Sequence, residues 1–247
     1  MATRLRQWVP SAAYGPVLRL TTPTLAGRSD EHHIALTLDD GPDERSTPAL
    51  LDTLSRFDVR ATFFVVGEHV GRHRMLIDEM HRSGHEIAVH GWTHTPAFRV
   101  RPDLLQANLK ATVDALADIT GVLPRWYRPP FGVATLASRD AARSAGLTTV
   151  LWTAWGRDWS RFVTADGIVR RVNWTLRPGG TVLLHDTDRY SAPDSWRRTD
   201  QALTSLLHQW NEQEIPVGPL AEHWGPLPDG VADGILSYRR YPSPLRE

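Results

Sequence analysis

The sequence predicts an α/β protein, a distorted (β/α) barrel with about seven parallel strands in a single domain. Short apolar, β-prone runs alternate with amphipathic helical stretches from residue 31 onward, and parallel strands need helical crossovers of this kind. The chain has 247 residues, a length at which a (β/α) barrel is commonly one domain. An open, doubly wound sheet would produce the same alternation and remains an alternative at this point.

The predicted elements follow one another in a regular order. The first strand covers residues 34–38, and a helix follows from Ser46 or Thr47 to about Phe57, with Pro48 tolerated in its first turn. Glycines that follow apolar-periodic stretches predict where later helices end. The remaining strands are expected at 61–66, 86–89, 125–128, 148–152, 181–184 and near 215–217, and the remaining helices at 69–83, 102–119, 135–145, 164–176 and 199–212.

Composition divides the chain into three parts. Residues 1–30 predict an irregular N-terminal extension that docks on the domain or contacts a membrane surface, 31–221 form the main domain, and 222–247 form a surface tail rich in proline and glycine. The N-terminus carries two arginines but no apolar run behind them, and no segment is long and apolar enough to span a membrane. We therefore expect a cytoplasmic protein, or a secreted one if the N-terminus has been trimmed.

Charge and cysteine content exclude several classes of function. The 28 basic and 28 acidic side chains balance, which argues against nucleic acid as a partner, because phosphate binding requires a basic surface. The chain has no cysteine, so disulfides, thiolate metal sites and a cysteine nucleophile are excluded. Its ten tryptophans are normally packing residues, although indole rings also stack on sugars.

Ionisable side chains follow five of the predicted strands. In a (β/α) barrel the carboxyl ends of the strands meet on one face, where active sites are built. A turn at Gly41 would bring two adjacent carboxylates toward one pocket. These strand-end residues are Asp39 and Asp40, His90 and His94, Arg128, Asp158 with Trp159, and His185 with Asp186.

The histidines at 90 and 94 suggest a metal site. Two other pairs, 69/73 and 81/85, share the four-residue spacing, but they fall in or beside a charged helix and predict a solvated face. One aspartate with two histidines leaves coordination positions open for water and substrate, as in a catalytic metal site. Zinc is the expected metal, with cobalt or nickel as alternatives. A second carboxylate could take a proton from water, and a histidine across the site could protonate a leaving group.

Four spaced motifs together resemble the NodB-like polysaccharide deacetylases of carbohydrate esterase family 4. They are Thr37-Leu-Asp-Asp-Gly41, His90-Gly-Trp-Thr-His94, Arg128-Pro-Pro-Phe131 and Leu183-Leu-His185. The resemblance covers roughly residues 33–220. It implies a distorted barrel and a divalent-metal-dependent removal of N- or O-acetyl groups from sugars.

The resemblance also implies a role for each matching residue. Gly91 departs from the Ser or Thr that the family has between the two histidines. The implied roles are Asp39 as general base, Asp40, His90 and His94 as metal ligands, Arg128 as the partner that orients Asp39, the Phe131 N–H as an oxyanion donor, and His185 as general acid.

The remaining motif, Asp-x-x-Asp-Trp in the family, is where this chain departs most. It reads Trp155-Gly-Arg-Asp158-Trp159 here. The resemblance implies that the first aspartate of the motif tunes the acid histidine, and Trp155 occupies that position. Asp158 and Asp186 are the candidate replacements. Asp158, Trp155, Trp159 and Leu183 are expected to line the substrate pocket.

Three hypotheses on function follow. The first is a metal-dependent deacetylase that acts on N-acetylglucosamine-type oligosaccharides or polysaccharides. The second is a related C–N hydrolase, a deacylase or deformylase, that acts on a lipid-linked or small amino sugar. The third is an inactive, metal-holding carbohydrate-binding module. Release of acetate separates the third hypothesis from the other two, and acetate versus formate separates the first two.

Overall fold

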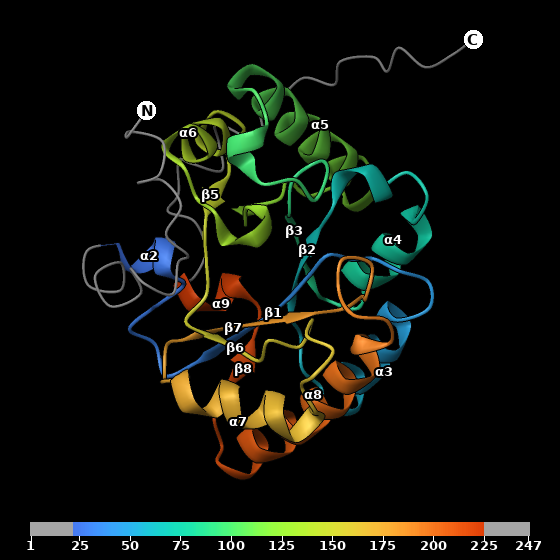
Figure 1. Ribbon diagram of the computed structural model, residues 1–247, viewed down its shortest axis with the longest axis vertical. Coiled ribbons are helices and arrows are strands. Elements are labelled where there is room, and N and C mark those ends of the chain that lie inside the picture. The colour runs from blue at the N-terminus through green and yellow to red at the C-terminus, as the bar shows by residue number, and fades with distance from the viewer. Residues whose placement is uncertain (1–21, 225–247) are drawn as a thin grey trace.

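The computed structural model describes residues 22–224 (Figure 1). The first 21 residues of the predicted extension and residues 225–247 of the predicted tail lie outside the described residues, as does any membrane contact that the extension would make. Within the described part of the chain, none of the helices combines the length and apolarity that crossing a membrane requires.

The named strands of the described part of the chain belong to one parallel sheet, which curls into a distorted barrel. Along the sheet the order is β5-β4-β3-β2-β1-β7-β6, and β8 pairs with β1. From β1 to β5 the strands advance in one direction, which is the winding of a barrel and not of a doubly wound sheet. The strands are β1 (Ile34–Asp39), β2 (Thr62–Val65), β3 (Glu86–Val89), β4 (Trp126–Tyr127), β5 (Thr148–Thr149), β6 (Ala154–Trp155), β7 (Thr181–His185) and β8 (Val217–Gly218).

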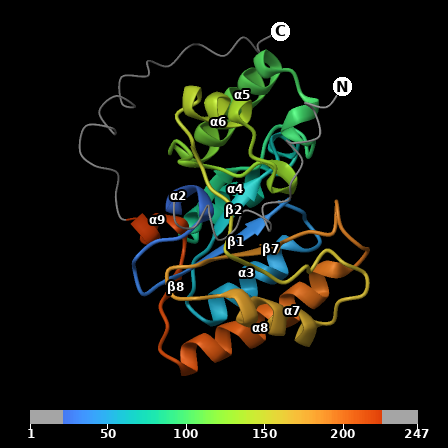
Figure 2. The same cartoon turned by 60° about the vertical axis from the view of Figure 1, so that its left-hand side comes forward.

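Helices surround this sheet (Figure 1), and α7 and α8 lie side by side along one part of it (Figure 2). Within residues 22–224, single 3₁₀ turns lie at 67–69, 97–99 and 130–132. The helices are α2 (Pro23–Ala26), α3 (Thr47–Arg56), α4 (Arg74–Arg82), α5 (Pro102–Thr120), α6 (Leu136–Ser144), α7 (Ala165–Thr175), α8 (Ser195–Glu212) and α9 (Leu220–Trp224).

Alternation along β1 explains how the strand serves both the core and the site. All six of its residues are buried. Leu36 and Leu38 belong to the large apolar cluster between sheet and helices. Ala35 belongs to a second, inner cluster with side chains of β2, β3 and β4. Because side chains alternate between the two faces of a strand, Asp39 falls on the same inner face as Ala35, at the carboxyl end.

The last described helix, α9, covers one end of the inner cluster. Leu220 of α9 is fully buried in it, and Trp224 packs against it. The Trp224 ring lies 5.1 Å from the ring of Trp126 on β4. The barrel is therefore filled with apolar side chains at one end, which leaves the opposite end, where the strands terminate, for polar side chains.

Several element boundaries differ from the sequence prediction. Strand β6 was not predicted, because its two residues give no periodic signal. The helix expected at 69–83 is a 3₁₀ turn followed by α4, and α8 begins at Ser195 instead of residue 199. Helix α9 runs across the predicted boundary after residue 221, so the packed part of the chain extends to Trp224.

Candidate active site

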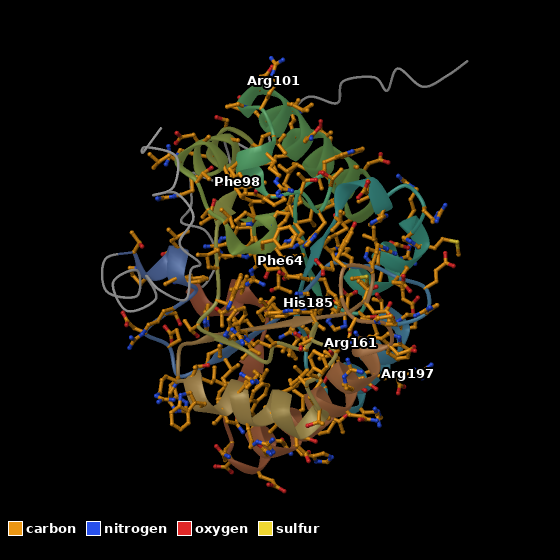
Figure 3. The ribbon with its side chains drawn as sticks, viewed as in Figure 1. Phe64, Phe98, Arg101, Arg161, His185 and Arg197 are labelled. Carbon is orange, nitrogen blue, oxygen red and sulfur yellow. The ribbon has the colours of Figure 1, made fainter. Side chains whose placement is uncertain are left out.

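The carboxyl ends of the central strands enclose a cavity of about 220 Å³. Figure 3 shows Phe64 and His185 in the middle of the molecule, inside the ring of helices. Asp39 and His185 end neighbouring parallel strands and are paired in register. The cavity wall includes all the predicted site residues except Arg128 and Asp158, which are fully buried behind it.

Adjacent carboxylates reach the cavity because the backbone turns sharply after β1. Asp40 has a φ of 85°, a left-handed conformation that costs a residue with a side chain about 1–3 kcal/mol. The sequence placed this turn at Gly41, but Asp40 itself carries the positive φ. Gly41 is needed for another reason, because a Cβ there would collide with the carboxylate of Asp186, which accepts a hydrogen bond from the Gly41 N–H at 2.9 Å.

Asp40, His90 and His94 present three ligand atoms within 4.8 Å of one another. Oδ1 of Asp40 lies 3.3 Å from Nε2 of each histidine. This buried oxygen accepts no hydrogen bond from the described residues, which is costly for a carboxylate. Burial alone would raise the pKa of Asp40, but the imidazoles of His90, His185 and His94 lower it to about 2. An ionised oxygen and two imidazole nitrogens are a donor set that fits zinc, cobalt or nickel.

Both histidines are held in a state suited to metal binding. His90 Nδ1 lies 2.9 Å from the carbonyl oxygen of Arg128, so Nδ1 donates and Nε2 keeps its lone pair for a cation. Burial, followed by the charge of His90, lowers the pKa of His94 to about 4, and its ring is therefore neutral at pH 7. The His94 ring stacks on Tyr190, with ring centroids 4.2 Å apart and planes inclined by 11°.

Arg128 holds Asp39 in place. Its Nη1 donates to Oδ1 of Asp39 at 2.7 Å and to the hydroxyl of Thr37 at 2.7 Å, and its Nη2 donates to the carbonyl of Leu151 at 2.9 Å. The guanidinium also lies 4.1 Å above the ring of Phe64. These contacts compensate the buried charge of Arg128 and fix the direction of the Asp39 carboxylate.

Asp158 is the carboxylate that contacts His185. Its Oδ1 accepts from Nδ1 of His185 at 2.9 Å, and its Oδ2 accepts from the His185 backbone N–H at 2.8 Å and from the Thr199 hydroxyl at 3.1 Å. Burial alone would lower the pKa of His185, but Asp158, with smaller contributions from Asp40 and Asp39, raises it to about 10.

The structure therefore gives Asp158 a different place from the substrate-pocket wall that the sequence predicted. Although position 155 is not an aspartate, His185 still has a carboxylate partner, Asp158. Asp186, the other candidate, forms no hydrogen bond or ion pair with the His185 ring among the described residues. Its Oδ2 accepts from the Thr47 hydroxyl at 2.6 Å, and it braces the turn after β1.

Comparison with known proteins decides the family. Residues 26–150 match the family model for polysaccharide deacetylase. A chitooligosaccharide deacetylase of Bradyrhizobium is 35% identical over 201 residues, which cover 78% of this chain and 91% of the relative. The chain belongs to the polysaccharide deacetylase family. A peptidoglycan-N-acetylglucosamine deacetylase of Listeria monocytogenes is 32% identical over 190 residues, 77% of this chain but 39% of that protein.

Solved structures of this family share the fold. A family 4 acetyl xylan esterase from Clostridium thermocellum, in complex with a cobalt ion, has a TM-score of 0.71 and 29% identity, with 78% of this chain and 90% of that chain covered. A family 4 pseudoenzyme from Bacillus anthracis has a TM-score of 0.70 and 25% identity, with 78% and 66% covered. The predicted membership in carbohydrate esterase family 4, and with it the predicted class of enzyme, is confirmed. Because the fold includes a pseudoenzyme, activity has to be argued from the site residues.

The family motifs do not contain every residue of the site. Tyr190 and Trp152 also line the cavity. Tyr190 contacts His94 as described, and its hydroxyl lies 2.9 Å from Nε2 of His69. Tyr190 stands in a loop with no periodic pattern, so only its position five residues after His185 could have drawn attention to it.

The two other histidine pairs are less exposed than the predicted solvated face. His73 is 7% exposed and His85 is 5% exposed. Burial, followed by the charge of Arg60, lowers the pKa of His85 to about 4, and its Nδ1 accepts from the Ala61 N–H at 3.2 Å. These two histidines are buried just before and just after α4, so helical spacing alone did not predict their environment.

Proposed function

We propose that this protein hydrolyses the N-acetyl groups of N-acetylglucosamine-type glycans. One observation carries the proposal. Asp39 and His185, a candidate base and a candidate acid, stand in register on adjacent strands and line the same small cavity as the three candidate ligands. A site that only bound sugar would need neither the Arg128–Asp39 pair nor the Asp158–His185 pair.

Asp40, His90 and His94 would hold the divalent metal. Zinc is the first choice, and cobalt and nickel fit the same donors. When bound, such a cation polarises an acyl carbonyl and makes water a stronger acid. The ionised Asp40 and the uncharged His94 favour its binding, because each ligand is already free of the proton that a metal would have to displace.

Asp39 is the proposed general base. Arg128 donates to Oδ1 of this carboxylate and fixes its direction, so that it can accept a proton from the water that attacks the acetyl carbon. As the new C–O bond forms, negative charge develops on the carbonyl oxygen. Phe131 lines the cavity, and its backbone N–H is the proposed donor to that oxyanion.

His185 is the proposed general acid. Because Nδ1 of His185 donates its hydrogen bond to Asp158, Nε2 is the atom that can give its proton to the departing nitrogen. The C–N bond then breaks, and the products are acetate and a free amino sugar. Asp158 acts through His185 and is a positioning residue in this scheme.

The cavity suits a small acyl group with its sugar. Its volume of about 220 Å³ lies below the range of about 300–1,000 Å³ that is usual for drug-sized ligands. Trp155, Trp159 and Leu183 form part of its wall, and the Trp159 ring meets His185 edge-on at 5.5 Å. These apolar faces would exclude water around the acetyl group and pack against the sugar.

Acetate release tests this proposal. The purified protein is treated with a chelator, assayed on N-acetylglucosamine oligomers, and assayed again after zinc is restored, with formate measured alongside acetate. We expect acetate release that disappears with the chelator and returns with zinc. Formate release, or turnover only of lipid-linked or small amino sugars, would replace this function with the second hypothesis. Sugar binding without release of any acyl group would support a binding module.

A further inference from the structure

A second, larger hollow lies beside the candidate active site. It is a groove of about 550 Å³ between α7 and the loop that follows β6. Trp155 lines both this groove and the active-site cavity, so the two hollows share a wall. We call it the arginine groove and define it by Trp155, Arg157, Phe162, Arg170, Arg171 and Trp174.

The groove is positively charged without compensation. Of the described residues that line it, three are arginines and none is acidic. Among residues 22–224, several exposed arginines on other helices pair with carboxylates, as Arg82 does with Asp78 and Arg143 with Asp140. Within the same described range, the three groove arginines form no ion pair. A cluster of unpaired guanidinium groups in a hollow attracts an anion, and carboxylates and phosphates match the guanidinium fork.

Exposed aromatic rings accompany the arginines. Phe162 is 88% exposed and Trp174 is 82% exposed, an unfavourable state for such large apolar side chains if they contact only water. The Arg157 guanidinium lies 5.3 Å from the ring of Trp155. Arg157 also has a φ of 56°, a left-handed backbone that costs a non-glycine residue free energy and commonly marks a functional position.

We propose that the arginine groove binds an anionic group of the glycan whose acetyl group enters the active-site cavity. The substrate class would then be acetylated glycans that carry carboxylates or phosphates. This inference rests on the proposed deacetylase function. A glycan fits better than a membrane surface, because the arginines line a hollow that adjoins the cavity through Trp155, whereas a lipid bilayer would need a protruding face.

Matched substrates test the proposal. Wild type, the double variant Arg170→Gln/Arg171→Gln and the control Arg101→Gln are assayed for acetate release with zinc present. Arg101 is an exposed arginine at the opposite end of the molecule from α7 (Figure 3). The substrates are a neutral N-acetylglucosamine oligomer, the same oligomer with carboxylates at C6, and the same oligomer with a terminal phosphate. Binding to anionic phospholipid vesicles is measured in parallel.

For wild type we expect a higher kcat/KM on at least one anionic oligomer than on the neutral one, and this preference should shrink as salt is added. The double variant should reduce the preference by roughly 2- to 30-fold, as expected for two partly exposed ion pairs, while Arg101→Gln retains it. The oligomer whose kcat/KM falls in the double variant, the one with carboxylates or the one with a phosphate, identifies the anion that the groove binds.

Three other results would differ clearly from the expected loss of substrate preference. Equal activity on all oligomers, unchanged in the double variant, would overturn the groove proposal and leave the deacetylase function standing. No acetate from any oligomer would instead refute the deacetylase function. Vesicle binding that the double variant abolishes, with an unchanged substrate preference, would make the groove a membrane contact and overturn the proposal.

Discussion

Replacement of Asp158 by Asn should separate the acid step from the rest of the reaction. Asp158 is fully buried and is the first contributor to the raised pKa of His185, which is about 10 despite burial. Without that charge, burial favours the neutral imidazole, and Asp40 Oδ2, 3.9 Å from Nε2, is the nearest remaining carboxylate. Because a positioned general acid contributes about 10²–10⁴-fold, we expect kcat on an N-acetyl sugar to fall by about 100-fold or more.

The choice of leaving group makes this prediction specific. An amine must be protonated as it leaves, whereas nitrophenolate does not need a proton. Asp158→Asn should therefore retain activity on nitrophenyl acetate to within about 10-fold of wild type. Thr199→Val is the matched control, because it removes only the hydroxyl bonded to Oδ2 of Asp158, worth about 0.5–1.5 kcal/mol. Equal losses on the amide and the ester, or no loss on the amide, would refute the role given to Asp158.

Three further predictions concern stability. Gly41→Ala should lower the free energy of unfolding by about 1–3 kcal/mol through the clash with Asp186, whereas Gly71→Ala, with open space around it, should leave thermal melting unchanged. Burial, followed by the charge of His33, lowers the pKa of His223 to about 4 from 6.5. As the pH falls, the unfolded chain therefore takes up this proton before the folded protein does. The contribution of His223 to the free energy of unfolding should be fully present above pH 6.5 and fall by at most about 3 kcal/mol as the pH drops through 4. His223→Phe should flatten that part of the denaturation profile, and an unaltered slope would contradict the assignment. Zinc at 100 times its Kd should stabilise the chelated protein by about 2.7 kcal/mol, and Asp40→Asn should abolish this shift in melting temperature.

The sequence predicted the parts of the fold that have long, regular signals. Strand β1, with its run of six buried residues, and the long helix α5 were both placed within a residue of their bounds. Strand β6 and the start of α8 were not, because a two-residue strand has no period and the first turn of α8 follows a left-handed residue, Asp194 with a φ of 56°. Pairing across the sheet decides a short strand such as β6, and the local turn at Asp194 decides where α8 begins. A linear pattern contains neither.

The same distinction holds for the site. The spaced motifs predicted correctly that the three candidate ligands and the Arg128–Asp39 pair lie close together. The reason is that strand ends in a barrel converge on one face, independently of the loop conformations. The partner of His185 depended on loop geometry. The motifs left Asp158 and Asp186 as candidates for the aspartate missing at position 155, and in the structure Asp158 is the one that contacts the histidine. Tyr190 was missed for the same reason, since its loop reaches His94 only in three dimensions.

The central claim is that the two adjacent carboxylates divide the work, with Asp40 holding the metal and Asp39 taking the proton. Bound zinc and acetate release measured on the same sample of Asp39→Asn test it most directly. The account predicts a full equivalent of zinc and a loss of acetate release of about 10²-fold or more, the loss expected when a general base is removed. Activity close to that of wild type, or loss of the zinc itself, would contradict it.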